Sequence, residues 1–182
     1  MKILTLICTF ALLAFAQSAK KEDGIRAFRD VAAVLTSPRC LNCHVSVDHP
    51  LQGDDNHAHI MKVARGNDGA GGNAAMRCAN CHQDANVSAP HAPPGAPGWR
   101  MPAAATPMAW QGLPEVGICR ALKDPQINGK RSLAELIKHV SSDKIVNWGW
   151  NPGPGRSVPP VSHEQFVDAV KAWVAAGAPC PE

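Results

Sequence analysis

The chain has 182 residues, and its 18 lysines and arginines against 15 aspartates and glutamates give a formal net charge of +3. This modest charge comes without a basic run or arm, so we expect no nucleic-acid partner. Aromatic residues make up only 5% of the chain, whereas glycine (15) and proline (16) are frequent. The composition predicts a thin apolar core in a chain of one domain or two small ones.

The N-terminus has the pattern of a secretory signal peptide. Lys2 supplies a basic start, residues 3–16 form a short apolar run, and Ala14-Phe15-Ala16 fits a small-x-small cleavage site. We expect residues 1–16 to be removed, with cleavage after Ala19 as the alternative. The run is short for a membrane span, and no later segment approaches the required length. The sequence therefore predicts an exported, periplasmic protein with no membrane span after cleavage.

A helix is predicted over residues 22–36, after the signal segment. Ile25, Phe28 and Leu35 recur at helical spacing. Pro38 is expected to stop this helix. The helix would therefore end directly before the first of two short cysteine motifs.

Two five-residue signatures follow, Cys40-Leu41-Asn42-Cys43-His44 and Cys78-Ala79-Asn80-Cys81-His82. Each is a CxxCH, the pattern that attaches a c-type haem. Two cysteines three apart lie about one turn from each other, so their sulfurs can form thioethers with the two vinyl groups of one porphyrin. The histidine that follows then supplies the proximal iron ligand. The sequence predicts two covalent haem c groups, held by Cys40, Cys43, His44, Cys78, Cys81 and His82.

A zinc site or a redox disulfide is the alternative interpretation of a lone CxxC pair. A zinc site would need each pair to complete the other, and His44 and His82 would have no role. Because both pairs end in histidine, haem attachment is preferred. The repeat is confined to the motif itself, since the flanking residues differ.

The second axial ligand of each iron decides the function. A second strong ligand suits electron transfer, whereas an open position suits a peroxidase, an oxidase or a gas sensor. Residues 54–61, between the two motifs, contain His57 and His59, and we expect at least one to ligate an iron. His59 is preferred and His57 is its rival. A solvated polar loop is the alternative for this segment.

Two irregular stretches organise the middle of the chain. Residues 66–73 are glycine-rich, and residues 88–107 are rich in proline, alanine and glycine. We therefore divide the mature chain into a dihaem-binding region, residues 20–105, and a helical region packing on the haems, residues 106–182. Met108, at this boundary, is a further candidate axial ligand, with filling of the core as the alternative.

The C-terminal region is predicted to be helical. One helix is expected over residues 114–123, and two more follow the capping boxes Ser132–Glu135 and Ser162–Gln165. Gly177 would cap the last helix, and residues 148–155 are expected to be irregular. No strand pattern of useful length is present. The predicted fold class is mostly α with extensive irregular loops.

The second of these helices carries His139 at the edge of its apolar stripe. This position suits a side chain that reaches a haem face, and we prefer His139 as the second distal ligand beside His59. An exposed helix-surface histidine is the alternative. Three further histidines, His49, His91 and His163, are expected to have structural or supporting roles. Arg100, Arg120 and Arg156 are candidates to pair with haem propionates.

The remaining cysteines indicate an oxidising compartment. The chain has 7 cysteines, of which Cys8 lies in the signal segment and four lie in the CxxCH motifs. Cys119 and Cys180 are left. A disulfide between them is the economical assignment in an exported protein, and two free thiols are the alternative.

The order of motifs resembles a group of small exported dihaem c-type cytochromes, labelled the cytochrome subunit of isoquinoline 1-oxidoreductase-like enzymes, which are molybdenum hydroxylases. Besides the CxxCH motifs, the resemblance rests on residues 51–55, 57, 59, 76–78, 94–97, 108–110, 122–125, 128–129, 131–133, 139, 148–150 and 177–181. It covers nearly all of the mature chain. The resemblance implies a dihaem cytochrome c whose partner is a redox enzyme of the molybdenum hydroxylase type. It also draws attention to His57, His59, Met108, His139, Cys119 and Cys180.

These observations favour a periplasmic dihaem cytochrome that carries single electrons between a redox enzyme and a respiratory chain. Such a carrier is an electron-transfer protein or subunit rather than an enzyme by itself. The alternative is a small dihaem peroxidase with one open iron site and a carboxylate such as Glu115 or Glu135 above it. A haem-based sensor is a third hypothesis, for which the chain offers no attached output domain.

Overall fold

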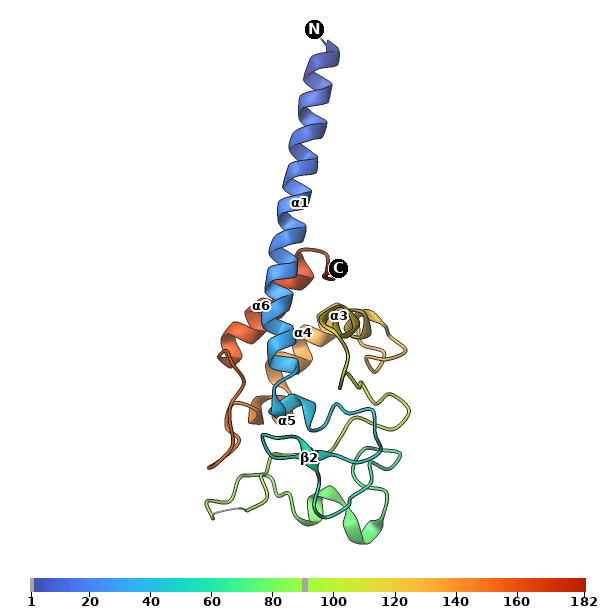
Figure 1. Ribbon diagram of the computed structural model, residues 1–182, viewed down its shortest axis with the longest axis vertical. Helices are drawn as coiled ribbons and strands as arrows, with labels where there is room; N and C mark the ends of the chain where they lie inside the picture. The colour runs from blue at the N-terminus through green and yellow to red at the C-terminus, as the bar shows by residue number, and fades with distance from the viewer. Residues whose placement is uncertain (1, 90–91) are drawn as a thin grey trace.

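The chain is described by a computed structural model that covers residues 2–89 and 92–182, with side chains described for residues 16–89 and 92–182. One long helix, α1 (Lys2–Leu35), projects from the molecule at its N-terminal end, and its C-terminal part enters a body of shorter helices (Figure 1). The irregular part of the chain lies beyond the end of α1, on the opposite side from the projecting N-terminus (Figure 1).

The expected class, mostly α with extensive irregular loops, is confirmed in this coarse form. The elements after α1 are α2 (Pro38–Leu41), β1 (Leu51–Gln52), β2 (His57–Ala58), the 3₁₀ turns η1 (Ala74–Met76) and η2 (Cys78–Asn80), α3 (Glu115–Lys123), α4 (Leu133–Ser142), α5 (Lys144–Trp148) and α6 (His163–Ala175). The two short strands pair antiparallel, with Leu51 opposite Ala58 and Gln52 opposite His57. Within the described ranges, none of the helices combines the length and the apolar character needed to span a membrane.

The first helix is longer than the sequence analysis predicts. It begins at Lys2 rather than near residue 22, because the stretch before Gly24 contains no glycine or proline that would break it. It ends at Leu35, close to the predicted end. Pro38 then opens the short helix α2, since the first position of a helix needs no amide donor.

The C-terminal helices follow their predicted signals. Both capping boxes form: the Ser132 hydroxyl accepts from the Glu135 amide, and the Ser162 hydroxyl accepts from the Gln165 amide. Gly177 follows α6 with φ +91°, the left-handed conformation that closes a helix. These contacts are local, which explains why the sequence reveals them.

Helix α5 is absent from the sequence-based prediction. Asp143 caps it, because its carboxylate accepts hydrogen bonds from the amides of Ile145 at 2.9 Å and Val146 at 3.2 Å. The expected irregular stretch over residues 148–155 is therefore wrong for Trp148, which ends α5. Residues 149–155 are irregular as predicted.

The core lies where α1 crosses α6, with α3 and α4 beside them. Phe28 of α1 packs against Trp173 of α6 with ring centroids 5.2 Å apart. Gly24 allows a close approach of the helix α1 to the end of α6, since a Cβ at residue 24 would lie 2.5 Å from the Cβ of Ala176. The loop residues Met108 and Trp110 complete this core. The helical body thus includes the helix that precedes the first CxxCH motif.

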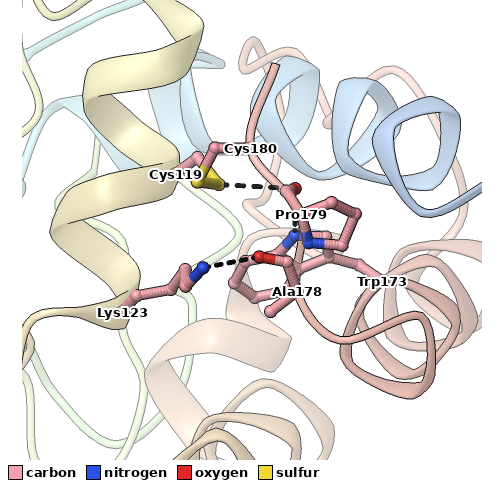
Figure 2. Close-up of a disulfide and its surroundings, with 6 residues drawn as sticks. All are labelled: Cys119, Lys123, Trp173, Ala178, Pro179 and Cys180. Carbon is pink, nitrogen blue, oxygen red and sulfur yellow. Dashed lines mark hydrogen bonds between the residues drawn. A yellow bond between two sulfur atoms is a disulfide. The ribbon is translucent and has the colours of Figure 1, made fainter. Parts of the chain in front are cut away.

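The predicted disulfide between Cys119 and Cys180 is confirmed. It joins α3 to the C-terminal tail across 61 residues of sequence, and Cys119 is fully buried. Figure 2 shows the tail held at two further points: Lys123 donates to the carbonyl of Ala178 at 2.8 Å, and the Trp173 indole donates to the carbonyl of Pro179 at 2.9 Å. The tail is therefore fixed to both α3 and α6.

Replacing both bridge cysteines by alanine should lower the stability of the protein. For a bridge spanning 61 residues, the chain-entropy model gives a loss of roughly 4 kcal/mol. Urea unfolding of C119A/C180A beside the wild-type protein measures this loss, and reduction of the wild-type bridge should reproduce it. A loss below about 1 kcal/mol would show that the hydrogen bonds of Lys123 and Trp173 hold the tail without the bridge.

Candidate haem sites

The two CxxCH motifs have the same local backbone geometry. In the first motif the amide of His44 donates to the carbonyl of Cys40 at 3.2 Å, and in the second the amide of His82 donates to the carbonyl of Cys78 at 2.9 Å. Each motif is thus one helical turn, formed at the end of α2 and at η2. This turn brings the two thiols of a motif to one side of the backbone and places the histidine directly after them.

The four motif cysteines form neither a disulfide nor a compact cluster in the described part of the chain. All four motif cysteines are free thiols, so neither pair forms a disulfide. Across the ranges for which the structure describes side chains, no three histidine, cysteine or acidic residues gather closely enough to hold a metal ion. The two pairs therefore do not complete each other in the way that a zinc site would require.

His44 is oriented by a carbonyl and an aromatic ring. Its Nδ1 lies 2.9 Å from the main-chain oxygen of Met108, and because a carbonyl only accepts, Nδ1 carries the proton. Its ring stacks on Trp110, with centroids 3.8 Å apart and planes inclined by 12°. Burial is the main cause that lowers the His44 pKa to about 4. Near neutral pH the ring is therefore neutral, and its Nε2 has a free lone pair.

His82 has the same two kinds of contact. Its Nδ1 donates to the main-chain oxygen of Pro94 at 2.7 Å, and its ring stacks on Trp99 at 4.5 Å with planes inclined by only 3°. Burial again is the main cause that lowers its pKa. The two sites therefore repeat both the motif and its surroundings, a carbonyl on Nδ1 and a stacked tryptophan, although the flanking sequences differ. No local signal reveals it, because the partners lie 12 and 64 residues from the histidines.

A cavity of about 710 Å³ adjoins the second motif, within the size range of roughly 300–1,000 Å³ for small-molecule sites. Its wall includes the motif residues Cys78, Cys81 and His82, and also Cys43 of the first motif. Four arginines line it, and no aspartate or glutamate does so among the described residues; the arginines are Arg39, Arg77, Arg100 and Arg156. The wall of the cavity therefore favours an anionic, largely apolar guest.

Arg39 is a cavity residue that the sequence analysis missed. Its side chain is only 3% exposed, pairs with Asp54 and donates to the carbonyl of Gly53 at 3.3 Å. Its Nε is buried without a hydrogen-bond partner, which is costly for a charged group. Of the arginines expected from the sequence, Arg100 and Arg156 line the cavity, whereas Arg120 lies on α3 and does not.

The structure separates the two histidines of the segment between the motifs. His59 lines the cavity, with its ring centroid 6.2 Å from that of His82. Its Nδ1 accepts a long hydrogen bond of 3.3 Å from the amide of Met61, so in the neutral ring Nε2 carries the proton. Binding of an iron through Nε2 would require the other tautomer and the loss of this bond. His57 does not line the cavity and instead pairs with Asp55 at 2.6 Å.

This segment is attached to the first motif by one side chain. The Asn42 amide donates to the carbonyl of Gly53 at 2.9 Å, and its oxygen accepts from the Asn56 side chain at 2.7 Å. The antiparallel pair β1–β2 is thus held beside the first motif. His59 directly follows β2 and lies beside His82 of the second motif. This explains how a histidine midway between the motifs comes to face His82.

His139 is held on α4 by an acidic neighbour. Its Nδ1 lies 3.5 Å from a carboxylate oxygen of Asp143. The hydrogen bond with His139 is the main cause that lowers the Asp143 pKa to about 2. A carboxylate on Nδ1 leaves Nε2 as the nitrogen available to a ligand. The charge of His139 is one of the smaller causes that lower the His44 pKa, after burial.

Met108 lies on the Nδ1 side of His44 rather than across from its Nε2. Its carbonyl accepts the His44 proton, while its buried sulfur lies 3.5 Å from a guanidinium nitrogen of Arg131. Its φ of +46° is unusual for a residue with a side chain. The backbone strain aims the carbonyl at His44, and this arrangement favours a supporting role over axial ligation.

The other histidines have local partners or lie outside the described residues. His49 pairs with Asp48 at 3.0 Å on the surface. His163 lies 2.7 Å from the carbonyl of Val140 through its Nε2, which fits the structural role expected for it. His91 falls outside the described residues.

Comparison of the chain with protein-family models, with curated proteins and with solved structures yields no match. The assignment of function therefore depends on the geometry of the two motifs and of the cavity.

Replacing Trp110 by alanine should destabilise the whole protein. The ring is 4% exposed, stacks on His44, and its indole nitrogen donates to the carbonyl of Leu35 at 2.8 Å. Removal of a buried tryptophan costs about 3–5 kcal/mol. Urea unfolding measures the change, and W99A is the matched control with a smaller expected loss, because Trp99 is only half-buried. Equal losses in the two variants would contradict the central position of Trp110.

Proposed function

We propose that the protein is an exported, periplasmic dihaem c-type cytochrome. It would carry single electrons between a redox enzyme, for example a molybdenum hydroxylase, and a respiratory chain. The observation that carries the proposal is the repeated arrangement of His44 and His82: each follows a CxxC turn, donates its Nδ1 proton to a carbonyl and stacks on a tryptophan. This is the arrangement that an axial imidazole ligand needs, because it fixes the tautomer and leaves Nε2 free.

The residues present fit two haem c groups. Cys40 and Cys43 would form the thioethers of the first group, and Cys78 and Cys81 those of the second. Through their Nε2 atoms, His44 and His82 would bind the irons. When bound, each group supplies an iron that gains or loses one electron without making or breaking a bond to the protein.

The positive charge of the arginines in the wall of the cavity beside the second motif supports this proposal. A porphyrin has an apolar body and two carboxylates, and the wall offers aromatic and aliphatic side chains together with four arginines. Arg39 and Arg156 are near enough that the charge of Arg156 contributes to lowering the Arg39 pKa, after the larger effect of burial. Asp54 offsets part of the charge of the cavity arginines through its pair with Arg39, and Asp68 offsets another part through its pair with Arg77. A propionate would pair with the remaining charge in charge-assisted hydrogen bonds.

The distance between His59 and His82 supports His59 as the distal ligand of the second site. Two imidazoles that bind one metal from opposite faces have ring centres about 6 Å apart, because each metal–nitrogen bond is about 2 Å long. The observed separation is 6.2 Å. At the first site, the pair His139–Asp143 supports His139 in the same role. Two strong ligands on each iron favour electron transfer.

A dihaem peroxidase remains the second candidate function, and one observation bears on where it would act. Among the described residues, the Nδ1 of His59 contacts the amide of Met61 at 3.3 Å and has no acidic partner of the kind that Asp143 gives to His139. The second site is therefore where a distal ligand could be displaced. The two carboxylates considered for acid–base chemistry do not line the cavity: Glu135 is held in the capping box of α4, and Glu115 lies on α3.

The holoprotein, secreted into the periplasm of a host with a cytochrome c assembly system, tests the proposal. We expect two covalently bound haems per chain by the pyridine haemochrome assay. Both should be low-spin in the ferric and ferrous absorption spectra, and carbon monoxide should leave the ferrous spectrum unchanged. A chain without covalent haem would overturn the proposed function. One high-spin haem that binds carbon monoxide and turns over peroxide would favour the peroxidase.

The pair of variants H59A and H57A tests the distal assignment. H59A should convert one of the two haems to a high-spin form that binds one carbon monoxide per chain. H57A should retain the wild-type spectrum, because His57 pairs with Asp55 outside the cavity. Low-spin spectra in H59A with high-spin spectra in H57A would reverse the assignment.

A further inference from the structure

We infer that Asn86 is a positioning residue for His82: it acts through the peptide group between Pro94 and Gly95 and thereby lowers the reduction potential of the second haem. This inference rests on the proposed function and deepens it, because it names a residue that adjusts one of the two sites. Asn86 lies outside the CxxCH motif and does not line the cavity. Its influence on His82 would therefore be exerted through the hydrogen bonds of the chain alone.

One peptide group connects Asn86 to His82. The carbonyl of Pro94 accepts the Nδ1 proton of His82 at 2.7 Å. The amide of Gly95, which belongs to the same peptide group, donates to the side-chain oxygen of Asn86 at 3.0 Å. Because the peptide group is conjugated, a hydrogen bond from its N–H makes its carbonyl a better acceptor. A stronger bond on Nδ1 in turn makes the imidazole a stronger donor to a metal.

The side chain of Asn86 is held in the orientation that this connection needs. Its oxygen accepts a second hydrogen bond from the indole nitrogen of Trp148 at 3.0 Å, and its amide nitrogen donates to the carbonyl of Asn151 at 2.7 Å. Two donors facing the oxygen and a carbonyl facing the nitrogen allow only one orientation of the amide. The oxygen of Asn86 therefore stays directed at the amide of Gly95.

Trp148 also connects Asn86 to the aromatic contact of His82. Its ring meets that of Trp99 edge-on, with centroids 4.7 Å apart and planes inclined by 80°. Trp99 stacks on the His82 ring at 4.5 Å. Asn86 is thus linked to both groups that orient the imidazole, the carbonyl on Nδ1 and the stacked tryptophan.

Gly95 permits the close approach on which the hydrogen bond to Asn86 depends. A Cβ at residue 95 would lie 2.2 Å from the carbonyl oxygen of Ala85 and 2.4 Å from that of Gln83. These distances are far below van der Waals contact, so a residue with a side chain would push the two segments apart. The segment that carries Asn86 can therefore reach the amide at residue 95 because that residue is glycine.

The first site has no counterpart of Asn86. The carbonyl of Met108 accepts the Nδ1 proton of His44, and the amide of the same peptide group belongs to Ala109. Within the part of the chain that the structure describes, this amide has no hydrogen-bond partner. The effect of Asn86 should therefore be confined to the second haem, and the first haem serves as a reference within the same molecule.

Redox titration of the holoprotein, followed in the visible spectrum, tests the inference with N86A. Without its acceptor, the Gly95 amide polarises the Pro94 carbonyl less, so His82 donates less to the iron and the ferric form is less favoured. One of the two potentials should rise, by up to about a tenfold change in the equilibrium constant, which is about 59 mV for one electron. The other should stay at its wild-type value. V87A, at the neighbouring exposed residue, is the control and should leave both potentials unchanged. An N86A protein with both wild-type potentials would overturn the inference.

A second pair of variants separates this effect from a merely structural role. N86D keeps an oxygen as acceptor for the Gly95 amide and gives it a negative charge, so the same potential should fall. V87D adds an equal charge at the neighbouring residue without contact to Gly95, and its effect should be smaller. Loss of structure alone would move N86A and N86D in the same direction. A rise of the potential in both, or an equal fall in N86D and V87D, would overturn the inference.

The comparison of N86D with V87D decides the question if N86A fails to fold. The number of covalent haems separates failure of the inference from failure of the proposed function. Two covalent haems whose potentials do not respond to Asn86 contradict the positioning role alone. A protein without covalent haem contradicts the proposed function and, with it, this inference.

Discussion

Trp110 connects three parts of the molecule that are far apart in the sequence. Its indole nitrogen donates to the carbonyl of Leu35 at the end of α1, its amide donates to the carbonyl of His44, and its ring stacks on the His44 imidazole. Because α1 packs against α6, these contacts fix the first CxxCH motif relative to the helical body. The position of Met108, two residues earlier, follows from them, and so does the carbonyl that orients His44.

The two candidate sites share this orienting principle but differ in their surroundings. Both motif histidines use a main-chain carbonyl on Nδ1, which orients the ring without placing a charge beside it. The first motif packs against the apolar core through Cys40 and Leu41, whereas the second adjoins a cavity with four arginines in its wall. The thin core expected from the composition is thus concentrated around α1, α6 and the first motif. The second motif depends mainly on loop contacts.

Local signals predicted the parts of the structure that depend on neighbours in the sequence. The capping boxes at Ser132 and Ser162 are formed within four residues, and the CxxCH turns within five. The Cys119–Cys180 bridge is predictable because these two cysteines lie outside both the signal segment and the CxxCH motifs. The carbonyl partners, the tryptophan stacks and the position of His59 depend on loops that meet only in the folded chain. For the same reason, the sequence leaves His57 as a rival of His59 and does not reveal the buried Arg39.

The close approach at Gly24 divides α1 into two stretches with different sources of stability. Residues 16–23 are all exposed, whereas Gly24 is the first buried residue of the helix among those with described side chains. From Gly24 onward, packing against α6 stabilises the helix. In the exposed residues 16–23, backbone hydrogen bonds do so, together with the ion pair between Asp23 and Arg26. Glycine also lowers the stability of a helix by about 1 kcal/mol relative to alanine. The boundary between the exposed and the packed part of α1 therefore falls at a residue that weakens the helix. A processing enzyme that cuts after residue 16 or 19 would therefore remove none of the buried side chains described, and maturation would leave the packed body intact.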